Sequence, residues 1–233
     1  MVFKKKENVC IIPARGGSKR IPLKNIKKFH GAPIISHCIK KVIKSKFFDK
    51  VIVSTDNKKI ADISSKNGAD VHVRSKKLSN DYTDTVTVIK NVILFLEKKN
   101  FFYKKICCIY PTSIFYNLSD LKKAINKLKN NKDYVFSATR YEHPIHRSFC
   151  KVGAKIKMNF PKAEKKRTQD LPVNYHDAAQ FYLGWKNSWL RKKNFFTNKS
   201  MFIDLPKARA QDIDNLTDWK NAEVLWRVRN RLK

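Results

Sequence analysis

One stretch near the start of the chain combines the residue types that bind phosphate. Residues 11–25 read IIPARGGSKRIPLKN, and cations flank its small residues in the run Arg15, Gly16, Gly17, Ser18 and Lys19. Glycines let backbone N–H groups converge on one point, and the cations add positive charge there. The turn follows a short apolar strand, as in α/β proteins that hold a polyphosphate, which disfavours an ordinary solvated surface turn. It matches neither the P-loop nor the dinucleotide pattern, so neither is predicted.

A second stretch, residues 211–214, carries two carboxylates at a suggestive spacing. Asp212 and Asp214 alternate across Ile213, so in an extended segment their side chains share one face. Such a pair suits Mg²⁺, which takes carboxylates together with substrate phosphates. The chain has only 19 acidic residues, which makes the pairing less expected by chance. The sequence predicts a Mg²⁺ site here, with Mn²⁺ as an alternative metal and an Asx turn before the last helix as the structural alternative.

A third cluster is dense in polar and aromatic residues. It comprises residues 167–171, RTQDL, and residues 175–182, YHDAAQFY. This composition suits recognition of a polar, ring-shaped ligand, and Arg167 could bind a carboxylate through two parallel hydrogen bonds. An ordinary loop with a structural tyrosine is an equally favoured interpretation.

The elements that must position these groups alternate between apolar strands and amphipathic helices. We predict strands at 9–13, 51–54, 70–73, 106–110, 134–139, 181–185 and 201–204. Helices are predicted at 34–46, 57–67 and 85–99, from an N-cap at Ser119 to about 128, and from a cap at Thr217 over 218–232. This pattern predicts an α/β fold, a mostly parallel sheet between two layers of helices. Residues 54–56, Arg74 and residues 111–113 then follow strand ends, where such sheets bind ligands.

One segment breaks the alternation. Residues 143–167 are rich in proline and charge, with an alternating piece around 152–158 that favours a hairpin or arm over another strand–helix unit. We therefore predict a single domain over residues 1–233 with this arm inserted.

Composition limits the classes of function. The formal net charge of +32 invites a nucleic-acid-binding interpretation, but the lysines are spread over separate segments, which indicates mostly solvated faces. Five cysteines without a CxxC motif fit a reducing compartment. No apolar run has the length of a signal-peptide core or of a bilayer span. We expect a cytoplasmic protein with no membrane partner and no specific nucleic acid.

Six blocks together resemble the family of CMP-nonulosonic acid synthetases, the CMP-sialic acid synthetase family. In order they are IIPARGGSKRIPLKN, FDKVIVSTD, VRSKKLSNDYT, YPTS, RTQDLPVNYHDAAQFYLGW and QDIDNLTDW, and they cover nearly the whole chain. The fifth block is most similar to the pseudaminic acid branch of the family. Sialate enzymes usually have an RPNG-like stretch where this chain has residues 176–179, HDAA, which favours an acceptor other than N-acetylneuraminate.

The resemblance implies a three-layer, Rossmann-like nucleotide-diphospho-sugar transferase fold with a small dimerisation arm. It implies that CTP and a nonulosonic acid give a CMP-sugar and pyrophosphate, in a homodimer that uses Mg²⁺. By motif match, the nucleotide-binding residues would be Arg15, Gly16, Gly17, Ser18, Lys19, Asn25, Arg74, Asp81 and Thr83. The catalytic residues would be Arg15, Lys19 and Asp214, the metal ligands Asp212 and Asp214, and the sugar-side residues Arg167, Gln180 and Tyr182.

Three alternatives remain at this stage. Within the class, the acceptor could be N-acetylneuraminate or 3-deoxy-manno-octulosonate. Outside it, a basic nucleic-acid-binding protein explains the charge but gives no reason for Asp212 and Asp214. A non-catalytic sugar-nucleotide sensor would bind the same ligands without turnover, and intact Arg15 and Lys19 argue against it.

Overall fold

The predicted apolar runs form one sheet at the centre of the molecule. A computed structural model describes residues 7–191 and 194–231. Its seven-stranded sheet has the order β11-β7-β10-β6-β1-β4-β5. These strands are β1 (Asn8–Pro13), β4 (Lys50–Thr55), β5 (Asp70–Val73), β6 (Lys105–Ile109), β7 (Tyr134–Arg140), β10 (Tyr175–Trp185) and β11 (Met201–Asp204). All neighbouring strands pair in parallel except β10, which is antiparallel to both β6 and β7. The prediction of a mostly parallel sheet is confirmed.

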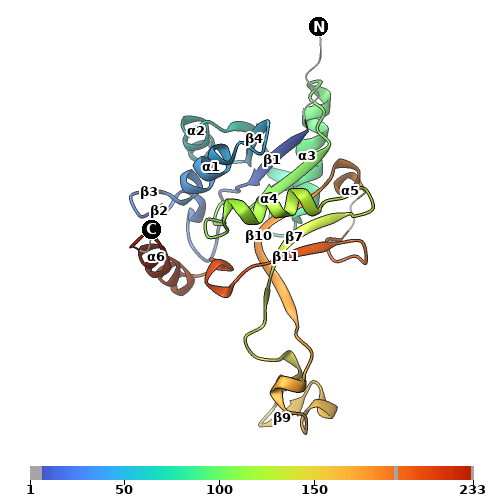
Figure 1. Cartoon of the computed structure of the whole chain (residues 1–233). Coiled ribbons are helices and arrows are strands. Elements are labelled where there is room, and N and C mark those ends of the chain that lie inside the picture. The colour runs from blue at the N-terminus through green and yellow to red at the C-terminus, as the bar shows by residue number, and fades with distance from the viewer. Residues whose placement is uncertain (1–6, 192–193, 232–233) are drawn as a thin grey trace.

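Helices cover both faces of this sheet, because its inner strands are apolar on both sides. In β1, Cys10 and Ile12 belong to one buried cluster, and Val9 and Ile11 belong to the other. The first cluster is completed by α1 (Ile34–Ser45), α2 (Lys58–Lys66), α4 (Leu118–Lys127) and α6 (Leu216–Arg231). The second is completed by α3 (Thr85–Lys98) and α5 (Lys186–Leu190). The result is the predicted three-layer arrangement (Figure 1).

The start of two helices differs from the prediction. Helix α4 is capped by Asn117 rather than Ser119, because the backbone N–H of Asn117 donates to the Asp120 carboxylate in a capping box. Helix α6 begins at Leu216, and the side chain of Asn215 accepts from the N–H of Asp218, so Thr217 lies inside the helix. The predicted end of this helix at position 232 and the first six residues of the predicted domain lie outside the described residues.

The irregular segment after β7 leaves the body of the protein before the chain returns as β10. It contains a hairpin of β8 (Phe149–Val152) and β9 (Lys155–Met158), turned at Gly153 with φ +61°. Figure 1 shows this hairpin projecting well below the sheet. The predicted alternating piece is therefore a hairpin. Because the chain re-enters at the edge where β7 ends, β10 runs against its neighbours and its first residues lie beside the carboxyl ends of the parallel strands.

Smaller elements were not predicted from the sequence. They are the short hairpin of β2 (Lys28–Phe29) and β3 (Ala32–Pro33), and helix α5. Within the described ranges 7–191 and 194–231, every helix is too short or too polar to cross a lipid bilayer.

Candidate functional site

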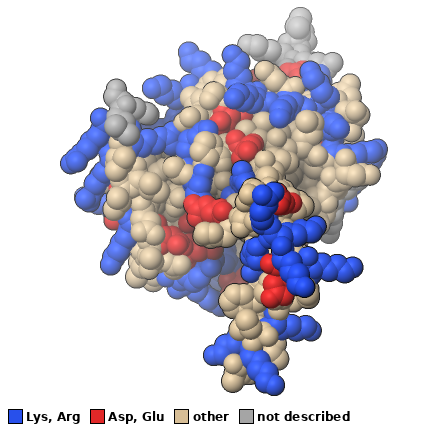
Figure 2. Space-filling view, turned by 60° about the horizontal axis from the view of Figure 1, so that its bottom comes forward, with Lys and Arg blue, Asp and Glu red and all other residues tan. Residues whose placement is uncertain are grey.

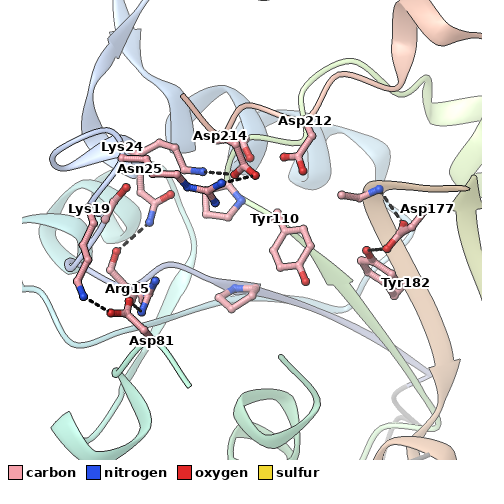
Figure 3. Close-up of a pocket in the computed structure, with 16 residues that line it drawn as sticks. Arg15, Lys19, Lys24, Asn25, Asp81, Tyr110, Asp177, Tyr182, Asp212 and Asp214 are labelled. Carbon is pink, nitrogen blue, oxygen red and sulfur yellow. Dashed lines mark hydrogen bonds and ion pairs between the residues drawn. The ribbon is translucent and has the colours of Figure 1, made fainter. Parts of the chain in front are cut away.

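Loops from several strands meet at the carboxyl edge of the parallel strands and enclose a cavity of about 690 Å³. Four segments line most of its perimeter: the loop after β1, the loop before α3, the residues that follow β6, and strand β10 between Asp177 and Tyr182. The segment before α6 closes the remaining side. The lining comprises Pro13, Arg15, Ser18, Lys19, Arg20, Lys24, Asn25, Asp81, Tyr110, Pro111, Thr112, Asp177, Ala179, Tyr182, Asp212 and Asp214 (Figure 3).

The loop after β1 is held in shape by buried polar contacts. Asn25 is buried, and its amide donates to the carbonyl oxygen of Arg15 over 2.9 Å. The N–H of Gly16 donates to the carboxylate of Asp56, also over 2.9 Å. A Cβ on Gly16 would lie 2.9 Å from the side chain of Asn57, the N-cap of α2. Glycine is therefore needed here for close approach to α2 rather than for a left-handed backbone.

At one end of the cavity, the cations of this loop face a carboxylate of the same chain. Asp81 lies 2.7 Å from Arg15 and 2.5 Å from Lys19 (Figure 3). Hydrogen bonds from Lys19 and Arg15 hold the pKa of the Asp81 carboxyl below its usual value. The carboxylate thus stays ionised at neutral pH, and it neutralises two cations that the sequence assigns to phosphate.

The carboxylate pair lies on another side of the same cavity. Ile213 is fully buried, which directs Asp212 and Asp214 into the cavity as the alternation predicted. Asp214 is 2.9 Å from Arg20 and 3.5 Å from Lys24. Partial desolvation and then the charge of Asp214 raise the pKa of the Asp212 carboxyl.

This donor set fits a divalent cation. Two carboxylates that disfavour each other's ionisation gain most from a cation placed between them. The described residues contain no group of three or more acidic, histidine or cysteine side chains that could hold a metal. A metal at Asp212 and Asp214 would therefore depend on phosphate oxygens and water for its other ligands, as Mg²⁺ does.

Opposite the cationic loop, the cavity is lined by a rigid acidic and aromatic corner on β10. The ladder between β10 and β7 is interrupted between Asp177 and Tyr182, and Ala179 has φ +51°. This bulge is fixed by the Asp177 carboxylate, which accepts from the Ala179 N–H over 2.8 Å and from the Tyr182 hydroxyl. Burial raises the pKa of Tyr182 and also that of Tyr110, so both hydroxyls stay protonated and can donate. Figure 3 shows Tyr110 between this corner and the cationic end.

Eight of the predicted site residues come together in this cavity. They are Arg15, Ser18, Lys19, Asn25, Asp81, Tyr182, Asp212 and Asp214. They come from four regions of the sequence, which supports the interpretation that the motif blocks serve one site.

Other predicted site residues lie outside the lining. Gly16 and Gly17 belong to the loop but do not line the cavity, and Thr83 is bound to the side chain of Asn80. Arg74 is buried behind the loop, where it donates to the carbonyl oxygen of Ser54 over 2.6 Å, while its Nε has no hydrogen-bond partner.

Two of the predicted sugar-side residues also lie away from the cavity. Gln180 is buried, and its amide donates to the carbonyl oxygens of Ala178 and Gln211 over 3.0 Å each. It therefore ties β10 to the segment that carries the carboxylate pair. Arg167 lies in the arm, exposed, and pairs with Asp170 over 2.7 Å.

The cavity also includes five residues to which the sequence gave no individual role, although all five lie in stretches that it singled out. They are Arg20, Lys24, Tyr110, Thr112 and Asp177. The sequence gave a reason to expect Arg20 and Lys24 at this site, because they lie in the same basic run as Lys19. Asp177 and Tyr110 carried little signal: their positions depend on the direction of β10 and on the end of β6, which follow from the tertiary fold.

Three comparisons place these observations among known proteins. Residues 9–229 match the family described as Cytidylyltransferase. A pseudaminic acid cytidylyltransferase from Campylobacter jejuni subsp. jejuni serotype O:2 is 40% identical over 225 residues, which cover 95% of this chain and 97% of that protein. The CMP-N,N'-diacetyllegionaminic acid synthase of Legionella pneumophila is 28% identical, with 93% and 95% covered.

Solved structures share the fold. A CMP:2-keto-3-deoxy-manno-octonic acid synthetase complexed with CTP has a TM-score of 0.70 with 12% sequence identity, covering 96% of this chain and 99% of that one. At this identity the likeness concerns the fold alone.

Proposed function

The chain belongs to the cytidylyltransferase family, and from this premise we propose that it transfers the cytidylyl group of CTP to a nonulosonic acid, with pseudaminic acid as the acceptor. The observation that carries the reaction class is one cavity that joins a cationic phosphate-binding loop to a pair of carboxylates. The observation that favours the acceptor is the 40% identity to a pseudaminic acid cytidylyltransferase over nearly the whole length of both chains.

The loop after β1 binds the triphosphate. Arg15 and Lys19 supply positive charge, and Ser18 supplies a hydrogen-bond donor. Gly16 and Gly17 shape the loop that presents these side chains, with the Gly16 N–H bound to Asp56. The anomeric hydroxyl of the sugar acid attacks the α-phosphorus of CTP, the bond to the β-phosphate oxygen breaks, and pyrophosphate leaves. Charge grows on the phosphate oxygens along this path, so fixed cations stabilise the transition state more than the ground state.

Asp212 and Asp214 hold the divalent cation, Mg²⁺ or Mn²⁺. When bound, such an ion neutralises phosphate charge and lowers the pKa of a hydroxyl that contacts it. Arg20 and Lys24, now paired with Asp214, remain beside the reacting phosphate as further cations.

Asn25, Arg74 and Thr83 surround the nucleoside, whereas Asp81, which the sequence also assigned to the nucleotide, lies against the phosphate-binding cations. The support is that Asn25 fixes the loop backbone and that the Nε of the buried Arg74 has no hydrogen-bond partner. A buried guanidinium N–H without an acceptor is costly, and an acceptor on the nucleotide would relieve that cost.

The sugar acid occupies the opposite end, beside Tyr182. Gln180 acts there indirectly, through its bond to the carbonyl of Gln211. Arg167 lies in the arm and outside the cavity lining, so we propose that it serves the site of a second copy and binds the carboxylate of the sugar acid there.

A homodimer built on the arm is the assembly that we propose. Among the described residues, one face of the hairpin exposes two large apolar side chains: Phe149 is 57% and Ile156 68% exposed. Apolar side chains gathered on a projecting hairpin mark a protein contact. Five free cysteines and a CTP substrate fit a cytoplasmic location.

Nucleic acid is the less favoured partner. Figure 2 shows Lys and Arg over the whole visible face, rather than gathered along one stripe or groove. Such a distribution gives weak, salt-sensitive attraction to polyanions, without a defined binding surface.

The test is a panel of acceptors with CTP and Mg²⁺, followed by pyrophosphate release. We expect turnover with pseudaminic acid, and much lower kcat/KM with N-acetylneuraminate and 3-deoxy-manno-octulosonate. Preference for either of the latter would replace the acceptor but keep the reaction class. Absence of pyrophosphate release with every acceptor, together with tight and salt-dependent binding of DNA or RNA, would reverse the proposal.

A further inference from the structure

Asp81 pairs with the two cations to which the proposed function assigns the phosphates of the substrate. We infer that Asp81 substitutes for the triphosphate within the chain itself. Its carboxylate pairs with Arg15 and Lys19 and must be displaced before a nucleotide binds. The inference rests on the proposed function for the identity of the ligand, but its core is a competition between two anions for the same two cations.

The contacts make the competition direct. A single carboxylate bridges both cations, at 2.7 Å from Arg15 and 2.5 Å from Lys19. All three side chains line the same cavity. A phosphate group that contacts both cations therefore has to replace the carboxylate oxygens of Asp81.

The segment that carries Asp81 can move without disturbing the core. Asp81 and Tyr82 are exposed, and Tyr82 reaches 96% exposure. The segment is organised by its own Asn80, whose side chain accepts from the N–H groups of Tyr82 and Thr83 over 2.9 Å each. Both hydrogen bonds lie within the loop, so they can persist when the loop moves.

Displacement of Asp81 favours highly charged ligands. Every ligand that reaches Arg15 and Lys19 has to break the same ion pairs, and only a ligand with enough negative charge restores the lost interactions. A triphosphate or pyrophosphate carries several negative charges. The phosphodiester of a CMP-sugar carries one, which is no more than the charge of the Asp81 carboxylate that it would have to displace. The carboxylate can therefore return once pyrophosphate has left, which favours release of the product.

The experiment measures binding in the absence of metal, by titration calorimetry with CTP, inorganic pyrophosphate and cytidine. Asp81→Asn keeps the shape of the side chain and removes its charge. We expect CTP and pyrophosphate to bind about two- to tenfold more tightly, the range for the loss of two exposed ion pairs, with cytidine unchanged. Asp81→Glu, which keeps the charge, should bind all three as the wild type does.

Asp62→Asn is the matched control. It makes the same change of net charge at an exposed position of α2 that does not line the cavity. If Asp62→Asn strengthens anion binding as much as Asp81→Asn does, the effect is general electrostatics and the inference fails.

The other outcomes are equally distinct. Weaker binding of both CTP and cytidine by Asp81→Asn would overturn the inference, because Asp81 would then contact the nucleoside. Unchanged binding of CTP and pyrophosphate would overturn it as well. Tighter pyrophosphate binding by Asp81→Asn with no CTP binding to either protein would support the inference, while it would contradict the proposed function. A wild type and a variant that both bind no anion would contradict both.

Discussion

Lys19 and Arg15 illustrate how single side chains define this site. They belong to a loop of small residues, and both reach the same carboxylate across the cavity. Lys24 and Arg20 repeat the arrangement with Asp214. Each of these four cations meets a carboxylate from a distant part of the chain. Under the proposed function, the phosphate would therefore replace Asp81 on its cations, and the metal would replace Arg20 and Lys24 on Asp214.

Removing a phosphate-binding cation should lower turnover strongly. For Lys19→Ala we expect a loss of more than tenfold in kcat/KM for CTP, since a charge-assisted contact to phosphate contributes about 1.5–3 kcal/mol. The measurement is steady-state pyrophosphate release at varied CTP. Lys59→Ala, at an exposed position of α2, is the control and should behave as wild type. An unchanged rate for Lys19→Ala would remove Lys19 from the mechanism.

Removing a proposed metal ligand should weaken metal binding. Asp214→Asn takes one of the two charged oxygen donors from the site and leaves the amide to face Arg20 and Lys24. We expect at least a tenfold loss of Mn²⁺ affinity in the presence of CTP, measured by electron paramagnetic resonance of free Mn²⁺. Asp62→Asn should bind Mn²⁺ normally. Normal Mn²⁺ binding by Asp214→Asn would exclude that residue as a ligand.

At the scale of elements, strand direction decides what faces the cavity. The parallel strands β1, β4, β5 and β6 end at one edge, so the residues that follow them converge there. Strand β10 runs the other way, so its first residues meet the same edge. Helix α3 begins directly after the Asp81 loop, and Thr85 in its first turn is hydrogen-bonded to the Tyr110 hydroxyl over 2.8 Å. The start of α3 therefore anchors that side of the site.

The cap of α3 should make stability depend on acidic pH. The Asp84 carboxylate accepts from the Thr87 N–H over 2.8 Å. Partial burial raises the pKa of Asp84, but hydrogen bonds from Thr87 outweigh it, and the pKa ends below its usual value. A depressed pKa means that the cap stabilises the fold above the unfolded-state pKa near 3.9, and that this contribution is lost as pH falls through the folded-state pKa.

Asp84→Ala tests the cap. We expect a loss of about 1 kcal/mol in the free energy of unfolding at pH 7, measured by urea denaturation. The difference from wild type should shrink as the pH is lowered below about 4, because the wild-type carboxylate is then protonated too. A difference that stays constant down to pH 3 would mean that the charge of Asp84 has no part in the cap.

At the scale of the whole molecule, the arm is the feature that the rest of the fold leaves unexplained. It carries exposed apolar side chains on a two-stranded hairpin, which alone is marginally stable in water. A second copy that covers the hairpin would bury these side chains and stabilise it. Elsewhere on the visible face, lysine and arginine side chains are widely spread (Figure 2).

A charge placed on the apolar hairpin should dissociate the proposed homodimer. Ile156 is 68% exposed, and Ile156→Glu would bury a carboxylate at the contact. We expect wild type to elute as a dimer and Ile156→Glu as a monomer in size-exclusion chromatography with light scattering. Lys157→Glu, on the opposite face of β9, should remain dimeric. A monomeric wild type would exclude this assembly.

The local pattern of the sequence determined a large part of this protein. The apolar runs predicted the strands of the sheet, and the small residues and cations of the first loop predicted a polyphosphate site. The carboxylate pair was predicted because Ile213 must be buried, and burial of one residue orients its neighbours to the other side. These features depend on residues close in sequence, which is why they can be read from it.

Contacts between distant segments were decided only by the tertiary structure. Asp81 meets Arg15 and Lys19 across the sheet edge, and Asp177 enters the cavity only because the chain returns from the arm as an antiparallel strand. The bulge at Ala179 then turns Asp177 towards Tyr182. Local sequence preferences do not predict these contacts, because each contact depends on the order and direction of the strands. Most of the charged residues of the site could therefore be predicted from the sequence, whereas their ion-pair partners depend on the fold.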